Sequence, residues 1–354
     1  MEVSSELRKS ILKDLDERGF CVVPGVIEEA DCDQILAKYK AWLSHFGEED
    51  FPKNRRTVIH GYGACQMEPT WEIRLKAKPV FASVWGTEKL LSSMDGIGLQ
   101  RPAQQKQDFD TGIFWFHCDQ ACTKVGVHSY QGALYLEATT QEDYCFRVIE
   151  GSHKKHQEFF PLFPKAMVKS EKKEFCMLTK EQTKWFYDNG CKVTNVEVPK
   201  GGMVLWDSRT MHDTKRPSKG LQNEERWRAL AFVSMTPAAW ATEADLKVKL
   251  EAYEGLEPTA HWGSRGVKIL RFMGEAEHPG KDMSKLKLTQ HPAVAKSPEV
   301  RRLVGIDRYD FDDGQPNGPD LPVYNAPSGI QISRKRKASF TQKSKGRKSK
   351  VARK

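Results

Sequence analysis

The sequence predicts an α+β protein in which a region of short strands, folded as a sandwich or barrel, is flanked by helices. Apolar residues recur at helical spacing through most of the first 94 residues and again after about residue 240. Between about residues 95 and 237, short β-type runs instead follow one another closely, separated by turn residues. This spacing favours a sandwich or barrel over alternating strand–helix units.

The N-terminal part is expected to be mainly helical. Residues 5–18 and 28–46 have helical apolar spacing, with a short β-type run at 20–27 between them. Residues 70–94 are also predicted to be helical, with a break near Pro79, because proline lacks the N–H that a helix interior requires.

The strand region contains five expected β segments, at 111–117, 131–138, 144–151, 194–207 and 227–237. One helix, at 172–190, is expected to interrupt them. After the strands, a charged helix is predicted at 241–256 and a short helix within 288–306.

Composition indicates a globular protein with a core, since 39% of the 354 residues are hydrophobic and 10% are aromatic. The first residues lack the layout of a signal peptide, and no apolar run approaches the length of a membrane span. We therefore expect an intracellular protein, nuclear or cytoplasmic, with no membrane partner. The eight cysteines form no CxxC pair and are expected to be free thiols.

The net charge of +9 comes from the C-terminus. Arg334 to Lys354 holds 11 of the 56 basic residues and no acid, so the rest of the chain is close to neutral. Residues 331–354 are predicted to be a disordered basic tail. Such a tail can bind an import receptor, which favours a nuclear location, or serve as an arm (334–354) for nucleic acid. A nonspecific solubilising tail is the alternative.

The stretch FWFHCDQ (114–120) is the first candidate for a chemical site. On a strand, His117 and Asp119 would point to one face and Cys118 to the other. A histidine and a carboxylate side by side supply two ligands of the facial triad that holds non-haem Fe(II) with open positions. An HxD pair alone, however, is more often an ordinary polar contact.

The third ligand must be a histidine from elsewhere, and His212 is the best candidate because it follows a Gly turn and an apolar strand in KGGMVLWDSRTMH. His128, His153 and His156 compete with it on sequence grounds alone. A zinc site built from the cysteines and histidines of 117–128 is disfavoured, because its spacing is poor and a strand would split its members between two faces.

Several pieces, taken in order, resemble the phytanoyl-CoA dioxygenase family, a branch of the Fe(II)/2-oxoglutarate-dependent oxygenases, and in particular a group of uncharacterised members common in fungi and protists. The matching pieces in the strand region are HCDQ, QGALYLE, EGSHKKHQEFF, KGGMVLWDSRTMH and RWRALAFVSMTP. Further pieces are GFCVVPGVI, WEIRL, VWGTEKLL and RRLVGID, so the resemblance covers roughly residues 15–307.

The resemblance implies a fold, a set of cofactors and a set of site residues. The fold would be a double-stranded β-helix (jelly-roll, cupin-like) core at about 95–240 with N-terminal and inserted helices, in an oxygenase domain spanning 1–330. His117, Asp119 and His212 would bind Fe(II), with 2-oxoglutarate and O2 as co-substrates. Arg228 would bind the far carboxylate of 2-oxoglutarate, because its planar fork matches a carboxylate; Arg226 remains the alternative.

The same resemblance implies hydroxylation of an organic substrate, most simply a small molecule, with release of succinate and CO2. Gln131 is a candidate contact to the cofactor or substrate. Two other functions stay open at this point: a nuclear oxygenase that modifies nucleic acid or a basic protein, and a catalytically inert jelly-roll binding module.

Overall fold

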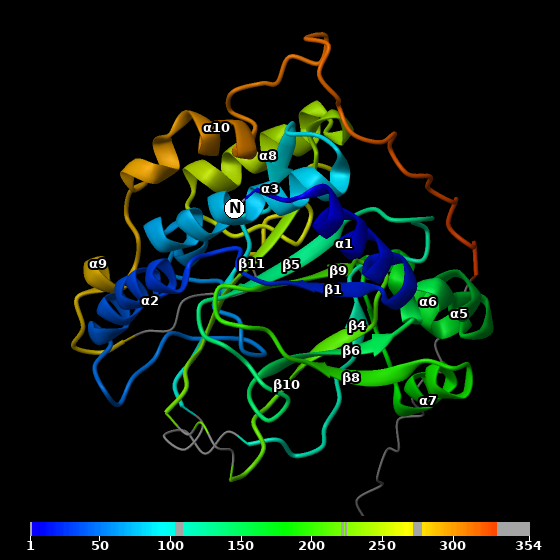
Figure 1. Ribbon diagram of the computed structural model, residues 1–354, viewed down its shortest axis with the longest axis horizontal. Helices are drawn as coiled ribbons and strands as arrows, with labels where there is room; N and C mark the ends of the chain where they lie inside the picture. The colour runs from blue at the N-terminus through cyan, green and yellow to red at the C-terminus, as the bar shows by residue number, and fades with distance from the viewer. Residues whose placement is uncertain (1, 103–108, 221–222, 224, 272–277, 331–354) are drawn as a thin grey trace, which may run out of the picture.

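The core consists of two antiparallel β-sheets that lie against each other (Figure 1). It is seen in a computed structural model that describes residues 2–102, 109–220, 223, 225–271 and 278–330. The larger sheet has the strand order β1-β9-β5-β11-β2, with β3 also paired to β11. Its strands are β1 (Phe20–Val23), β2 (Leu90–Ser92), β3 (Ile97–Gln100), β5 (Tyr130–Tyr135), β9 (Met203–Asp207) and β11 (Arg228–Pro237).

The smaller sheet has the order β7-β4-β10-β6-β8. Its strands are β4 (His117–Cys118), β6 (Cys145–Glu150), β7 (Cys176–Met177), β8 (Lys192–Val196) and β10 (His212–Lys215). Apolar side chains of both sheets, among them Tyr135, Phe146 and Trp206, form one buried cluster between the layers. The expected double-stranded β-helix core within an α+β fold is therefore confirmed.

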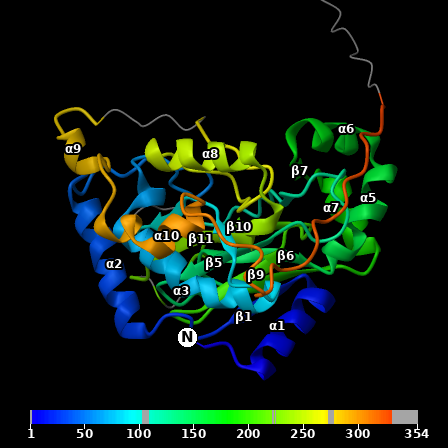
Figure 2. The ribbon, with the colours of Figure 1, turned by 90° about the horizontal axis from the view of Figure 1, so that it is seen from above.

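Helices cover the outer side of the larger sheet and one end of the smaller one (Figures 1 and 2). The α-helices are α1 (Ser5–Arg18), α2 (Glu29–Ser44), α3 (Glu68–Trp85), α5 (His156–Leu162), α6 (Pro164–Lys173), α7 (Lys180–Asp188), α8 (Glu243–Glu254), α9 (Met283–Leu286) and α10 (Pro298–Val304). Short 3-10 turns are η1 (Ala64–Gln66), η2 (Ser152–Lys155), η3 (Ala238–Trp240) and η4 (Ala293–Lys296). In both views α3, α8 and α10 lie over the larger sheet, and α5, α6 and α7 group together.

The predicted break at Pro79 is wrong. α3 continues through Pro79 and ends at Gly86, which adopts the left-handed conformation (φ 66°). The apolar face of α3, including Val80, Phe81 and Trp85, is buried against the larger sheet. That burial outweighs the cost of an interior proline, about 3 kcal/mol. Residues after Gly86 turn into β2 instead of extending the helix.

Other expected elements are shorter than predicted. The segment 111–117 contributes only its last residue to β4, and 172–190 holds the end of α6, then β7 and α7. The helices at 5–18, 28–46 and 241–256 are found close to their expected bounds.

All eight cysteines are buried free thiols, as expected. Within the described ranges, every helix is too short or too polar to cross a bilayer. The predicted basic tail, 331–354, lies outside the described residues, so the division of the chain at residue 330 stays a prediction.

Candidate active site

Antiparallel pairing of β4 with β10 brings two distant histidines together. His117 and His212 are direct register partners, and their ring centroids lie 4.3 Å apart. Asp119, one residue past β4, places Oδ1 3.8 Å from His117 Nε2 and Oδ2 3.6 Å from His212 Nε2. The three potential ligand atoms all lie within 4.8 Å of one another. The structure thus assembles the three residues that the sequence singled out.

Hydrogen bonds fix the direction in which these groups point. His212 Nδ1 donates to the Thr210 carbonyl oxygen at 2.9 Å, so Nε2 carries the lone pair that faces Asp119. Gln131 Nε2, on β5, donates to Asp119 Oδ2 at 3.1 Å. The Gln131 Oε1 atom is buried and has no hydrogen-bond partner among the described residues. Gln131 therefore contacts the carboxylate of the cluster.

Burial sets the protonation states of the cluster. Burial, followed by the nearby His212, lowers the pKa of His117 to about 3, and burial also lowers the pKa of His212. Burial alone would raise the pKa of Asp119, but the surrounding imidazoles, His261 first, bring it down to about 2. At neutral pH His117 and His212 are therefore neutral imidazoles and Asp119 is an ionised carboxylate, the forms that bind a metal ion.

A buried ion pair holds in place the two segments that carry the candidate ligands. Asp213, next to His212, accepts two hydrogen bonds from Arg147 of β6, each 2.7 Å long. Its Oδ2 also accepts the backbone N–H of Trp115 at 3.0 Å. The Trp115 ring then stacks on the His117 imidazole, with centroids 4.6 Å apart and planes 12° apart. One carboxylate thus positions both sides of the site.

A cavity of about 570 Å³ opens onto His117 and Asp119. Aromatic side chains form much of its wall, namely Trp115, Phe175 and Trp262. Basic side chains lie around it as well, and the segment 260–270 closes one side. The site therefore pairs a polar floor with a largely apolar chamber, which is typical of small-molecule sites.

His261 is a residue of this site that the sequence did not reveal. Its Nε2 lies 3.9 Å from Asp119 Oδ2, and its Nδ1 is hydrogen-bonded to the buried Asp95. Burial would lower the pKa of His261, but the Asp95 and Asp119 carboxylates raise it to about 9. It lies in a segment without regular structure, where no periodicity or motif marks a functional histidine.

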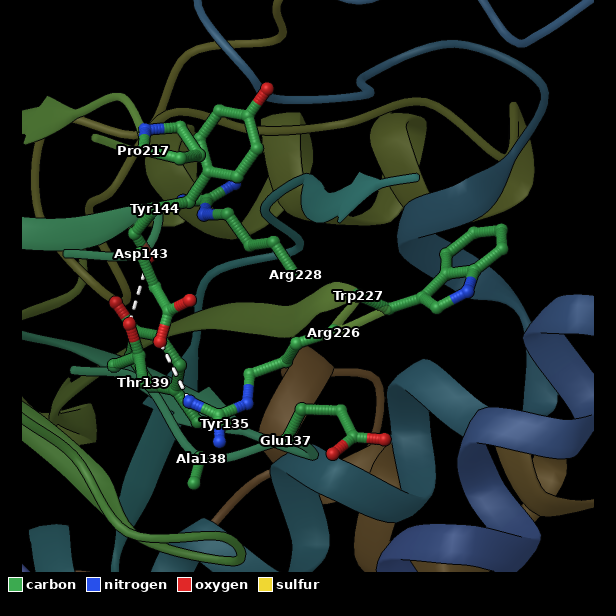
Figure 3. Close-up of a pocket in the computed structure, with 10 residues that line it drawn as sticks. All are labelled: Tyr135, Glu137, Ala138, Thr139, Asp143, Tyr144, Pro217, Arg226, Trp227 and Arg228. Atoms are coloured by element: carbon green, nitrogen blue, oxygen red, sulfur yellow. Dashed lines mark hydrogen bonds and ion pairs between the residues drawn. The ribbon is translucent and has the colours of Figure 1, made fainter. Parts of the chain in front are cut away.

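Arg228 begins β11 and points into the interior beside Tyr144, whereas Arg226 reaches Asp143 (Figure 3). Arg228 Nη1 donates to the Thr57 carbonyl oxygen at 3.0 Å and to Gln100 Oε1 at 2.7 Å, while its buried Nε has no partner in the described structure. No carboxylate of the described residues pairs with it. Arg226, in contrast, is ion-paired at 2.7 Å and lies before the strand.

The competing histidines serve structural contacts. His153, His156 and His128 donate from Nε2 to the carbonyl oxygens of Asp16, Gln120 and Val323, respectively, at 2.9–3.2 Å. In the part of the chain that the structure describes, His117, Asp119 and His212 form the one group with metal-binding geometry. Cys118 and Cys122 lie in an apolar cluster, so the zinc arrangement is not formed.

The residues present fit the expected cofactors. Two neutral imidazoles and one carboxylate on a common face are the donor set of Fe(II) sites that keep open positions for a co-substrate and O2. A buried guanidinium without a carboxylate partner suits the far carboxylate of 2-oxoglutarate.

Comparisons with known proteins identify the family of the chain. Residues 15–219 match the family model described as phytanoyl-CoA dioxygenase. A curated relative, "Ava biosynthesis cluster protein O" of Aspergillus versicolor, is 29% identical over 267 residues, which is 70% of this chain and 84% of the relative. Among solved structures, the epimerase SnoN in complex with Fe3+, alpha ketoglutarate and nogalamycin RO is 13% identical (TM-score 0.48; 66% of this chain, 85% of that one).

The alpha ketoglutarate-dependent carbocyclase SnoK is 16% identical, with a TM-score of 0.46, over 65% of this chain and 84% of that one. The family match spans more than half of the chain, and the expected cofactors, Fe(II) with 2-oxoglutarate and O2 as co-substrates, are those of the matched family and suit the donor set. The chain therefore belongs to the phytanoyl-CoA dioxygenase family of Fe(II)/2-oxoglutarate-dependent oxygenases.

Proposed function

We propose that this protein hydroxylates a small organic substrate, with oxidative decarboxylation of 2-oxoglutarate to succinate and CO2. The observation that carries the proposal is the buried His117–Asp119–His212 cluster, of which His117 and Asp119 line a chamber large enough for a small molecule. In this proposal the three side chains hold Fe(II), and bound Fe(II) supplies the activation of O2 that the hydroxylation requires.

The surrounding residues are assigned roles by their contacts. The Thr210 carbonyl keeps the His212 ring in the tautomer that offers Nε2 to the metal, and Gln131 orients the Asp119 carboxylate. Arg228 is proposed to bind the far carboxylate of 2-oxoglutarate through its planar fork, steadied by Gln100.

The chamber itself contributes by excluding water. Trp115, Phe175 and Trp262 present apolar surface around the reacting centre, so a bound substrate displaces solvent from it. This matters for an oxygenase because water in the site favours wasteful side reactions. Hydroxylation is the simplest outcome for such a site.

Anaerobic titration with Fe(II) and 2-oxoglutarate tests the site directly. The wild-type protein should develop the weak visible charge-transfer band of an iron-bound 2-oxoglutarate. His212→Ala should lose it, because the triad loses one of three ligands. His45→Ala, which changes an exposed histidine at the end of α2, is the matched control and should keep the band. A wild-type protein without the band, or a His212→Ala variant that retains it, contradicts the proposal.

A further inference from the structure

A tight turn at the edge of the cavity holds an arginine in an uncommon backbone conformation. Arg55 and Val58 exchange two backbone hydrogen bonds of 2.9 and 3.0 Å, so Arg56 and Thr57 form the tip of a two-residue turn. Both tip residues have positive φ, 50° and 69°. Glycine or asparagine normally occupies such positions, and another residue there costs on the order of 1 kcal/mol. Strain of this kind is found preferentially at ligand-binding sites.

The turn is tied to the residue proposed to bind 2-oxoglutarate. The Thr57 carbonyl oxygen accepts hydrogen bonds from Arg228 Nη1 at 3.0 Å and from Gln100 Nε2 at 2.8 Å. These two hydrogen bonds fix the backbone of the turn, and the Arg56 side chain lies at one wall of the cavity.

The Arg56 guanidinium faces an aromatic ring and has no anionic partner within the described part of the chain. It lies over the Trp115 ring, with its central carbon 4.6 Å from the ring centroid, and Trp115 stacks in turn on His117. Among the described residues, its Nη2 has a hydrogen-bond contact only with the weak acceptor Met177 Sδ, at 3.4 Å. No carboxylate of the described residues pairs with Arg56. Arg56 is exposed to the cavity, and a guanidinium of this kind favours an anionic ligand.

The charged side chains around the cavity are mainly basic, like Arg56 itself. Four basic side chains line it, Arg55, Arg56, Lys173 and Lys268, and Glu174 is the one acid in the lining besides Asp119. Glu174 is ion-paired with Lys268 at 2.7 Å, so it does not neutralise the arginine side. A basic rim beside an aromatic wall attracts anions that carry an apolar body.

We propose that the substrate is an organic acid whose carboxylate pairs with Arg56 and whose planar apolar body packs against the aromatic wall of Trp115, Phe175 and Trp262. This inference rests on the proposed function and adds the substrate class to it. Arg56 then determines specificity. The Trp115 ring lies between it and His117 of the proposed metal site.

Matched probes test the proposal in the anaerobic protein loaded with Fe(II) and 2-oxoglutarate. The probes are 3-phenylpropionate and indole-3-propionate, each with its primary amide and its amine, together with 3-phenylpropyl phosphate. Binding is followed by the change in the visible band and by quenching of tryptophan fluorescence, since two tryptophans line the cavity. In wild type, the acids should bind at least about tenfold more tightly than their amides, and the amines more weakly still.

Two variants show whether Arg56 is responsible. Arg56→Gln should reduce the preference for acid over amide to within about twofold, because it removes the fork and the charge. Arg18→Gln removes an arginine outside the cavity, paired with Glu150, and should keep the preference.

The results separate this inference from the proposed function. Equal binding of acid and amide, failure of every acid to bind, tighter binding of the phosphate, or an unchanged preference in Arg56→Gln overturns the inference while the band is present. Absence of the band in wild type refutes the proposed function instead.

Discussion

Arg228 owes its position to a neighbour without a side chain. Gly98 of β3 lies opposite Leu230 of β11, and a Cβ atom built at Gly98 would collide with Arg228 Nη1. The colliding atom is the end of a flexible side chain, so an added methyl group displaces the guanidinium more readily than the backbone. The absence of a side chain at Gly98 thus leaves room for the guanidinium that Gln100 and Thr57 hold.

Gly98→Ala is therefore expected to weaken 2-oxoglutarate binding at least about tenfold, which corresponds to about 1.4 kcal/mol, with little change in the thermal unfolding midpoint. Arg228→Gln should weaken it further. Arg226→Gln, which removes a guanidinium already paired with Asp143, is the matched control and should stay within about twofold. Titration of the charge-transfer band gives the three dissociation constants. If Arg226→Gln is the damaging change, the wrong arginine has been assigned.

At the scale of strands, the Arg147–Asp213 ion pair does more to hold β4 and β10 in the sheet than their few ladder hydrogen bonds do. β4 has two residues and β10 has four, so few ladder hydrogen bonds hold them. The side chains of Asp213 and Arg147 are 0% and 4% exposed, and they join β10 to β6 and to the backbone of Trp115. Removing one partner leaves the other charge buried.

Arg147→Met should lower the free energy of unfolding by about 3–5 kcal/mol, because Asp213 is left buried and unpaired. The double variant Arg147→Met/Asp213→Leu should recover much of that loss. Arg308→Met breaks an exposed pair with Glu243 and should cost less than about 1 kcal/mol. Urea unfolding of the metal-free protein measures all three. A loss in Arg147→Met no larger than that of Arg308→Met contradicts this account.

The strand pattern explains why the grouping of the three candidate ligands could be predicted and the position of His261 could not. The polar residues at 117, 119 and 212 follow apolar runs, and with the family resemblance they indicate one site. The strand assumed for the first pair is shorter than expected, because β4 ends at Cys118, yet both side chains still converge. His261 reaches the site through long-range contacts with Asp95 and Asp119, and no local pattern encodes such contacts.

At the scale of the whole molecule, the region after residue 240 is part of the active site as well as of the fold. The family match ends at residue 219, yet Ala260, His261 and Trp262 line the cavity. The sequence predicted the helices α8 and α10 but gave no sign of this contribution, because irregular segments carry no periodicity. The nuclear location and the nucleic-acid arm remain predictions from residues 334–354, outside the described part.

Lys249, which anchors α8 to the core, should make the free energy of unfolding depend on pH. Lys249 is fully buried and donates to the Ser92 carbonyl oxygen at 2.5 Å. Burial, with a smaller effect from Arg74, lowers the pKa of Lys249 to about 7, whereas an unfolded lysine titrates near 10.4. Between these values the unfolded chain binds more protons, so this group makes stability rise with pH; below about 7 the cost of burying the charge is fully present.

Lys249→Met removes this dependence. Relative to wild type, the variant should have a larger free energy of unfolding at pH 6.5 than at pH 9.5, because only the wild type loses the burial cost as pH rises. Urea unfolding at both pH values checks this, and comparison between the two proteins cancels the other titrating groups. A difference that is the same at both pH values means that Lys249 is not the group responsible.

The hydrogen bonds to the Thr57 carbonyl oxygen couple the binding of 2-oxoglutarate to the binding of the proposed acid. This oxygen is held by Arg228 and Gln100, and the residue before Thr57 in the chain is Arg56. A carboxylate that draws Arg228 toward itself changes the hydrogen bonding of this turn, so the co-substrate and the proposed acid would both act on the turn that carries Arg56. Any cooperativity that results must be reciprocal: the factor by which one ligand alters the affinity of the other is the same in both directions.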